Sequence, residues 1–142
     1  MSTRPPKIQT ETIEILKLGG VIVKLIFVRH GKDDNRYRGG WSNLDLIPEG
    51  MEQAKQLAQY LKDNNQDYLI THIISSDLPR TMSTAHFISS ELGLPIQKEF
   101  RIREIDNGDL AGMLNDTALE KFEFFQHREL PISFYINLSD TV

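Results

Sequence analysis

Three short segments of this sequence carry side chains that suit the chemistry of a phosphate ester. Arg29 and His30 leave an apolar run, and Gly31 directly after them would let a bulky anion approach the backbone closely. Arg80 lies in a turn that opens a helix, where free N–H groups and the helix dipole favour anions. Two guanidinium groups of fixed geometry suit a phosphoryl group better than two lysines would.

Acidic side chains are concentrated in the third segment, residues 101–112, a glycine-bearing loop. A carboxylic acid in such a loop could protonate a leaving alkoxide. We favour Glu104 for this role because it precedes Ile105 and Gly108. Asp106 and Glu99 remain alternatives, and each of the three could equally be a surface carboxylate.

The elements that must position these side chains alternate between strand and helix. The run Val21–Val28 is β-branched and almost continuously apolar, which is typical of a strand covered on both faces. Residues 32–48 are polar and rich in glycine, which indicates a functional loop. We expect further strands at Thr12–Leu18, Tyr68–Ile74 and Pro95–Phe100, and helices at Pro48–Asn64, Pro79–Leu92 and Asn115–Arg128.

This alternation predicts a three-layer α/β/α fold with a mostly parallel sheet and helices on both faces. In such sheets ligands bind outside the C-terminal ends of the strands, where residues 29–31 and 75–80 both fall. The chain of 142 residues fits a single domain. Residues 1–12 are expected to be a flexible lead-in, and residues 129–142 an atypical tail that could form one strand.

Composition narrows the classes of protein that fit. The net charge of −4 argues against a nucleic-acid binder, because such a surface would repel a phosphate backbone. No apolar run approaches the roughly 20 residues that span a bilayer. The sequence contains no cysteine and shows no signal peptide, so we expect a cytoplasmic protein without a membrane partner.

Four motifs in order resemble the histidine phosphatase superfamily, whose fold is phosphoglycerate mutase-like. The hallmark is Arg-His-Gly after an apolar strand, here residues 29–31. The segments 35–54, 75–85 and 103–112 resemble the stretch after the nucleophile, the motif of the second arginine and the loop of the acid. The resemblance covers roughly residues 21–119, and its strength lies in the order of the motifs.

The resemblance implies a mechanism that needs no metal or cofactor. His30 would attack phosphorus in line and become a phosphohistidine, while Arg29 and Arg80 neutralise the phosphoryl oxygens. Glu104 would protonate the leaving oxygen and then activate water. Gly31, Arg36 and Trp41 are further candidates for substrate binding. Arg36 lies where members of the family can contact substrate, and Trp41 is expected to line the entrance of the pocket.

Two departures from the family pattern bear on this expectation. Lys32 and Asp33 stand where the family commonly has Glu and a small hydroxyl residue. The family's second histidine, which follows a late apolar strand, has no counterpart before the sequence ends. His72, His86 and His127 are candidates for it, but none has that setting.

We therefore expect a phosphomonoester hydrolase that acts on a small phosphorylated metabolite through phospho-His30. A mutase of the same fold and a catalytically impaired phosphate-binding or interaction module are the alternatives. Loss of a strand beside the nucleophile would expose a sheet edge, so we also hypothesise a homodimer paired through that edge.

Overall fold

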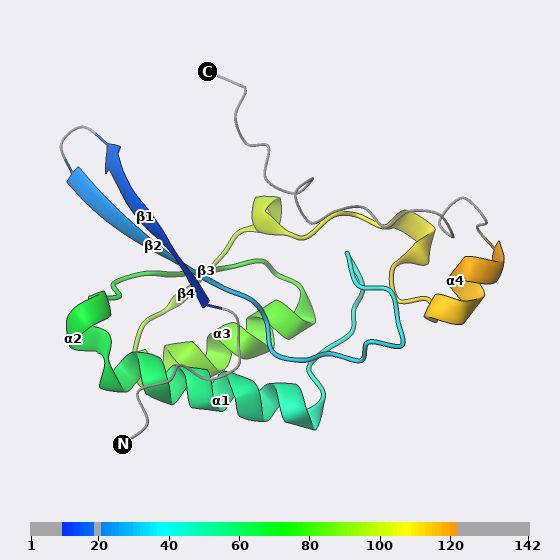
Figure 1. Cartoon of the computed structure of the whole chain (residues 1–142), viewed down its shortest axis with the longest axis horizontal. Coiled ribbons are helices and arrows are strands. Elements are labelled where there is room, and N and C mark those ends of the chain that lie inside the picture. The colour runs from blue at the N-terminus through cyan, green and yellow to red at the C-terminus, as the bar shows by residue number, and fades with distance from the viewer. Residues whose placement is uncertain (1–9, 19–20, 122–142) are drawn as a thin grey trace.

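A computed structural model describes residues 10–18 and 21–121 of the chain. The described chain alternates short strands with helices, and the two longest helices lie side by side beneath the strands (Figure 1). The strands are β1 (Thr10–Leu18), β2 (Val21–Val28), β3 (Ile73–Ser75) and β4 (Ile96–Lys98). The α-helices are α1 (Pro48–Asp63), α2 (Asn65–Tyr68), α3 (Pro79–Leu92) and α4 (Asn115–Lys121), and 3-10 turns occur at Phe100–Ile102 and Gly108–Leu110.

Strand β2 ends at the predicted residue but has a different environment from the predicted one. It pairs antiparallel with β1, from Thr10 opposite Val28 to Leu18 opposite Val21. Phe27 is 54% exposed, so the expectation of a strand covered on both faces is wrong for the described residues. An apolar run fits a hairpin strand as well as a central parallel strand, and periodicity alone cannot separate the two.

Parallel pairing occurs between β3 and β4, where Ile73 lies opposite Ile96 and Ser75 opposite Lys98. The strand predicted from Tyr68 is shorter, because α2 takes up Tyr68 and Leu69 follows in a left-handed conformation with φ of 54°. The strand predicted for residues 95–100 is likewise limited to Ile96–Lys98. Asn65 causes part of this difference: its side-chain oxygen accepts from the Ile70 amide and holds the turn.

Helices α1 and α3 pack against each other and form the core. Leu57, Ala58 and Leu61 of α1 are buried against Ile88 of α3, and Val28 from β2 packs onto this cluster. These contacts place the end of β2 directly beside the two helices. Both helices lie on the same side of the strands in Figure 1, so a second helical layer is not seen within residues 10–18 and 21–121.

The ends of α3 follow the prediction. Pro79 occupies the first turn, and Gly93 ends the helix with φ of 68°, a conformation that glycine adopts without strain. Strand β1 begins at Thr10, inside the predicted lead-in. The last part of the helix predicted to reach Arg128, the tail and His127 lie outside the described residues.

The loop after β2 is held in place by backbone pairing although it is polar. Asp33 forms a β-bridge with Leu46, and Tyr37 forms one with Leu114. The Ile47 amide also donates to the Lys32 carbonyl at 3.0 Å. This pairing gives the loop a defined course over the end of β2. No helix within the described residues is long and apolar enough to cross a membrane.

Candidate active site

His30 lies immediately after β2, and its ring orientation is fixed by a backbone hydrogen bond. Nδ1 lies 2.7 Å from the Gly31 carbonyl oxygen, which can only accept, so Nδ1 carries the proton. Nε2 of the neutral ring is therefore left with a free lone pair. This is the form of imidazole that acts as a nucleophile.

The surroundings of His30 favour that neutral form. Burial is the largest influence and lowers the pKa of His30 below its usual value of 6.5. The hydrogen bond to Gly31 and the charge of Asp33 oppose this shift, and the charges of Arg80 and Arg29 add to it. The ring should remain unprotonated, and its lone pair available, at neutral pH.

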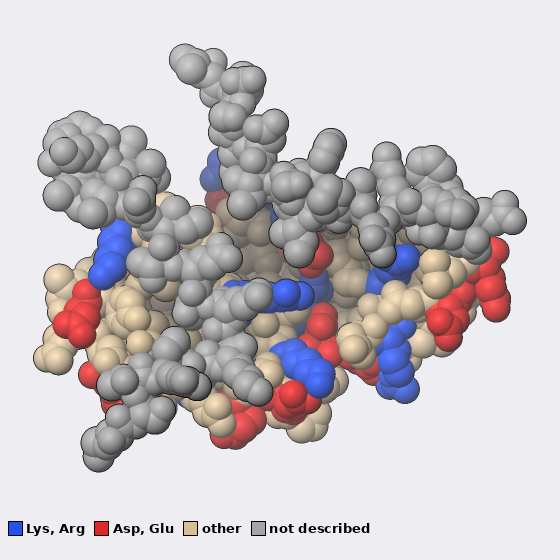
Figure 2. Space-filling model, in the orientation of Figure 1, with Lys and Arg blue, Asp and Glu red and all other residues tan. Residues whose placement is uncertain are grey.

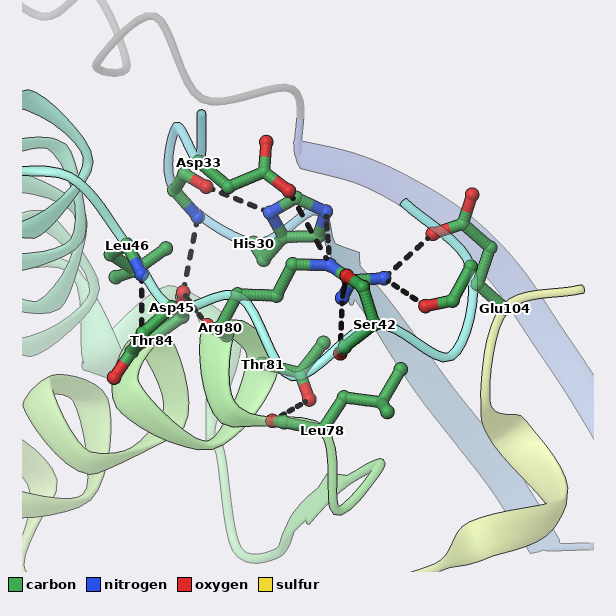
Figure 3. Close-up of polar contacts among 12 residues, drawn as sticks. His30, Asp33, Ser42, Asp45, Leu46, Leu78, Arg80, Thr81, Thr84 and Glu104 are labelled. Atoms are coloured by element: carbon green, nitrogen blue, oxygen red, sulfur yellow. Dashed lines mark hydrogen bonds and ion pairs between the residues drawn. The ribbon is translucent and has the colours of Figure 1, made fainter. Parts of the chain in front are cut away.

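Arg80 is buried, with 1% of its surface exposed, at the start of α3. Its Nε donates to His30 Nε2 at 3.3 Å, so the cation meets the lone pair of the histidine (Figure 3). The Gly40 carbonyl accepts from the Arg80 guanidinium at 2.7 Å, and both oxygens of Ser42 accept at 3.3–3.4 Å. These neutral oxygens hold the buried guanidinium in place without cancelling its charge, which is met instead by nearby carboxylates.

Glu104 lies beside His30 and Arg80, and its ion-pair partner distinguishes it from the other two candidate acids. Its Oε2 accepts from Arg80 at 2.9 Å, whereas Glu99 is paired with Arg101 and Asp106 accepts from the Gly108 amide. The side chain of Glu104 is 51% exposed, so it can turn between Arg80 and solvent. Of these three acids, Glu104 alone contacts the pair formed by His30 and Arg80 in the described chain.

Two glycines allow the end of β2 to meet the start of α1. A Cβ atom on Gly31 would overlap the backbone of Gly50, and one on Gly50 would overlap the backbone of Lys32. The backbones are thus in direct contact beside the histidine. Neither position tolerates a side chain without movement of the main chain.

Thr84 links the residue that follows His30 to the helix that carries Arg80. Its buried hydroxyl accepts from the Gly31 amide at 3.0 Å and donates to the Arg80 carbonyl at 2.8 Å. The Thr84 side chain therefore sets the spacing between the segment after β2, which carries His30, and the start of α3, which carries Arg80. It is a positioning residue, since no contact joins it to the space between His30 and Arg80.

Replacing Thr84 with valine is expected to lower kcat/KM for a phosphate ester about tenfold and the free energy of unfolding by about 1–3 kcal/mol. The shape is kept, but the buried Gly31 amide loses its acceptor. Thr84→Ser, which retains the hydroxyl, is the matched control and should recover most of the activity. Equal loss in both variants would show that the hydroxyl alone does not account for the role of Thr84.

The other predicted site residues lie at the edge of this cluster. Arg29 is exposed and has no ion pair among the described side chains, although its charge acts on His30. Trp41 donates from its indole to the Glu104 carbonyl at 2.8 Å and lies under the guanidinium of Arg103. Arg36 pairs with Asp34 and lowers the pKa of that carboxyl to about 2. Within the described chain its side chain bonds Asp34 rather than the cluster.

Sequence reasoning missed several parts of the site. Thr84 and Gly40 lie within segments that resemble the family, but no role was predicted for the Thr84 hydroxyl, the Gly40 carbonyl or Ser42. Asp33 was noticed only as a departure from the family pattern. Its carboxylate lies 3.7 Å from Arg80 Nε, inside the cluster.

Further histidines and metal ligands do not join the cluster in the described part of the chain. His72 and His86 are exposed, and their rings hydrogen-bond to the Thr71 hydroxyl and the Met82 carbonyl, respectively. No group of three acidic or histidine side chains is placed to hold a metal ion within residues 10–18 and 21–121. Figure 2 shows acidic and basic side chains interleaved over the visible described surface, with no continuous basic face there.

Comparison with known proteins assigns this chain and its fold to a family. The family model of the histidine phosphatase superfamily, branch 1, matches residues 25–131, so the chain belongs to that superfamily. A solved structure of mycobacterial glucosyl-3-phosphoglycerate phosphatase complexed with VO3 matches with a TM-score of 0.56 and 27% identity, over 65% of this chain and 45% of that one. The predicted family and its phosphoglycerate mutase-like fold class are confirmed.

Sequence relatives include both phosphatases and mutases. Phosphoserine phosphatase 1 from Hydrogenobacter thermophilus is 41% identical over 104 residues, which cover 71% of this chain and 47% of that relative. A 2,3-bisphosphoglycerate-dependent phosphoglycerate mutase from Nitratidesulfovibrio vulgaris is 33% identical, over 63% of this chain and 37% of the mutase. The chain thus spans half or less of the length of these relatives.

Proposed function

We propose that this chain hydrolyses a small phosphomonoester through a phosphohistidine formed on His30. The observation that carries the proposal is the pairing of a neutral, oriented imidazole with a buried guanidinium. His30 Nε2 and Arg80 Nε are 3.3 Å apart, and Nδ1 is tied to Gly31 on the far side of the ring. A phosphorus atom bonded to Nε2 would bring its oxygens within reach of Arg80.

The reaction would proceed in two balanced steps. In the first, the Nε2 lone pair forms a bond to phosphorus, the ester P–O bond breaks, and protonated Glu104 gives its proton to the leaving oxygen. In the second, Glu104 takes a proton from water while the oxygen attacks phosphorus, which releases phosphate and restores His30. Arg80, with Arg29 at the open side, offsets the negative charge on the phosphoryl oxygens in both steps.

Hydrolysis is favoured over mutase transfer because Glu104 stands half exposed. Water can therefore reach the acid that would activate it, whereas a mutase must exclude water while the phosphoryl group is transferred. The names of the relatives cover both activities, so the comparisons support either reaction.

A phosphate-binding module remains the candidate from another class, since His30 is the only histidine in the described chain that contacts Arg80. Residence in the cytoplasm and pairing of two copies through a sheet edge stay predictions.

Turnover of p-nitrophenyl phosphate in the presence of EDTA tests the proposal. The wild-type chain should release p-nitrophenol, and His30→Ala should reduce kcat by about 10³-fold or more, because the covalent step is lost. His86→Ala is the matched control, since His86 is exposed and bonded only within α3. Absence of turnover in the wild-type chain, with phosphate still bound, would favour the binding module instead.

A further inference from the structure

Asp33 places a second carboxylate inside the proposed anion site. Its Oδ2 lies 3.7 Å from Arg80 Nε, the nitrogen that also donates to His30 Nε2 at 3.3 Å. Figure 3 shows Asp33 above the histidine at the Nε end of the guanidinium, with Glu104 at the opposite end. A phosphoryl oxygen that binds this nitrogen must therefore lie close to the Asp33 carboxylate.

The backbone holds Asp33 in this position. The residue forms a β-bridge with Leu46, and its neighbour Lys32 accepts from the Ile47 amide. The Asp33 side chain is 24% exposed, which leaves it less room to leave the site than Glu104 has. The main chain thus places the Asp33 carboxylate beside Arg80.

The charges that face Asp33 come from every element around the site. The end of β2 supplies Arg29 and the neutral His30, α3 supplies Arg80, and the acidic loop supplies Glu104. The adjacent cations are engaged elsewhere: Lys32 pairs with Glu49, and Arg36 pairs with Asp34. Arg80 thus meets two carboxylates before any anion arrives, while the charge of exposed Arg29 acts on His30. A phosphate dianion would add two more negative charges.

We propose that Asp33 couples phosphate binding at this site to the uptake of one proton, which is shared between its carboxylate and a phosphoryl oxygen. Two arrangements have the same atoms and charge: a carboxylic acid that donates to phosphate, or a P–OH that donates to carboxylate. Either one replaces repulsion between like charges with a hydrogen bond. The inference rests on the proposed function, because it concerns the same anion site, and it makes the phosphomonoester monoanion the preferred substrate form.

The consequence is an acidic working range. A phosphomonoester loses its second proton near pH 6. Above that pH the free ester brings no proton, so the proton shared with Asp33 must be taken up from solvent. Above that pH, binding that takes up one proton weakens about tenfold for each pH unit. Burial lowers the pKa of His30 and so extends toward acid the range in which its ring is neutral, which is the same direction.

Titration calorimetry with inorganic phosphate at pH 8, in two buffers of different ionisation enthalpy, measures the protons taken up. The wild-type chain should take up close to one proton for each phosphate bound, and Asp33→Asn should take up almost none while binding about tenfold more tightly. Asp33→Ser provides a second variant of the same kind. Asp63→Asn is the matched control: it makes the same change at the far end of α1, about 20 Å of helix away from Gly50, and should behave as wild type.

Several results would overturn the inference. These are uptake retained in Asp33→Asn, uptake lost in Glu104→Gln but kept in Asp33→Asn, or no phosphate binding by the wild-type chain. The proposed function is judged separately by turnover. Phosphate binding with Asp33-dependent uptake but without turnover would leave the inference standing and remove the hydrolase. Turnover with the same pH profile of kcat/KM in wild type and Asp33→Asn would support the hydrolase and overturn the role of Asp33.

Discussion

Replacing Arg80 with methionine is expected to lower kcat/KM for p-nitrophenyl phosphate by about 10³-fold or more. The guanidinium is the one buried cation in contact with His30 Nε2 in the described chain. Arg80→Lys keeps the charge but lacks the planar set of N–H donors of a guanidinium, so it should recover only part of the lost kcat/KM. Steady-state kinetics on the three proteins measures the effect.

The same substitution should also weaken the fold. The carbonyl oxygens of Gly40 and Ser42 lose their donor in a buried site, which costs about 2–4 kcal/mol in the free energy of unfolding. Arg101→Met is the control, because that side chain is exposed and paired only with Glu99. If Arg80→Met retained wild-type kinetics, Arg80 would not contact the phosphoryl group.

Replacing Gly31 with alanine is expected to destabilise the chain by about 3 kcal/mol or more and to abolish most of its activity. The new methyl group would overlap the Gly50 carbonyl, so the end of β2 and the start of α1 must separate. His30 and Arg80 would then lose their spacing. Chemical denaturation and turnover of p-nitrophenyl phosphate measure the two effects.

Gly39→Ala provides the matched control in the same loop. A Cβ there would meet only the Glu104 carboxylate, at 3.7 Å, which is an ordinary contact. Its free energy of unfolding should change by less than about 1 kcal/mol. Equal destabilisation in the two variants would show that the close approach to Gly50 is not what the glycine provides.

The sequence was most informative where a short motif coincides with the end of an element. His30 and Gly31 were located because an apolar run stops there, and Arg80 because Pro79 marks the start of a helix. These are local signals, which depend on neighbouring residues rather than on tertiary contacts. The two ends of α3 were predicted correctly for the same reason.

Pairing between distant segments was harder to predict. The choice among Glu99, Glu104 and Asp106 depends on which arginine each one meets, and spacing does not encode this. The direction of β2 in its sheet depends on β1, whose own pattern is short. Asp33 illustrates the limit: its type was visible in the sequence, but its distance from Arg80 follows from a loop bridged to Leu46.

The central claim is that His30 becomes phosphorylated during turnover. Because the P–N bond of phosphohistidine is hydrolysed in acid, the reaction is best quenched rapidly into alkali and the peptides analysed by mass spectrometry. The account predicts one added phosphoryl group on the peptide that contains His30, which appears within the first turnover and is absent in His30→Ala. Steady turnover without any phosphorylated peptide, or a label on another residue, would contradict it.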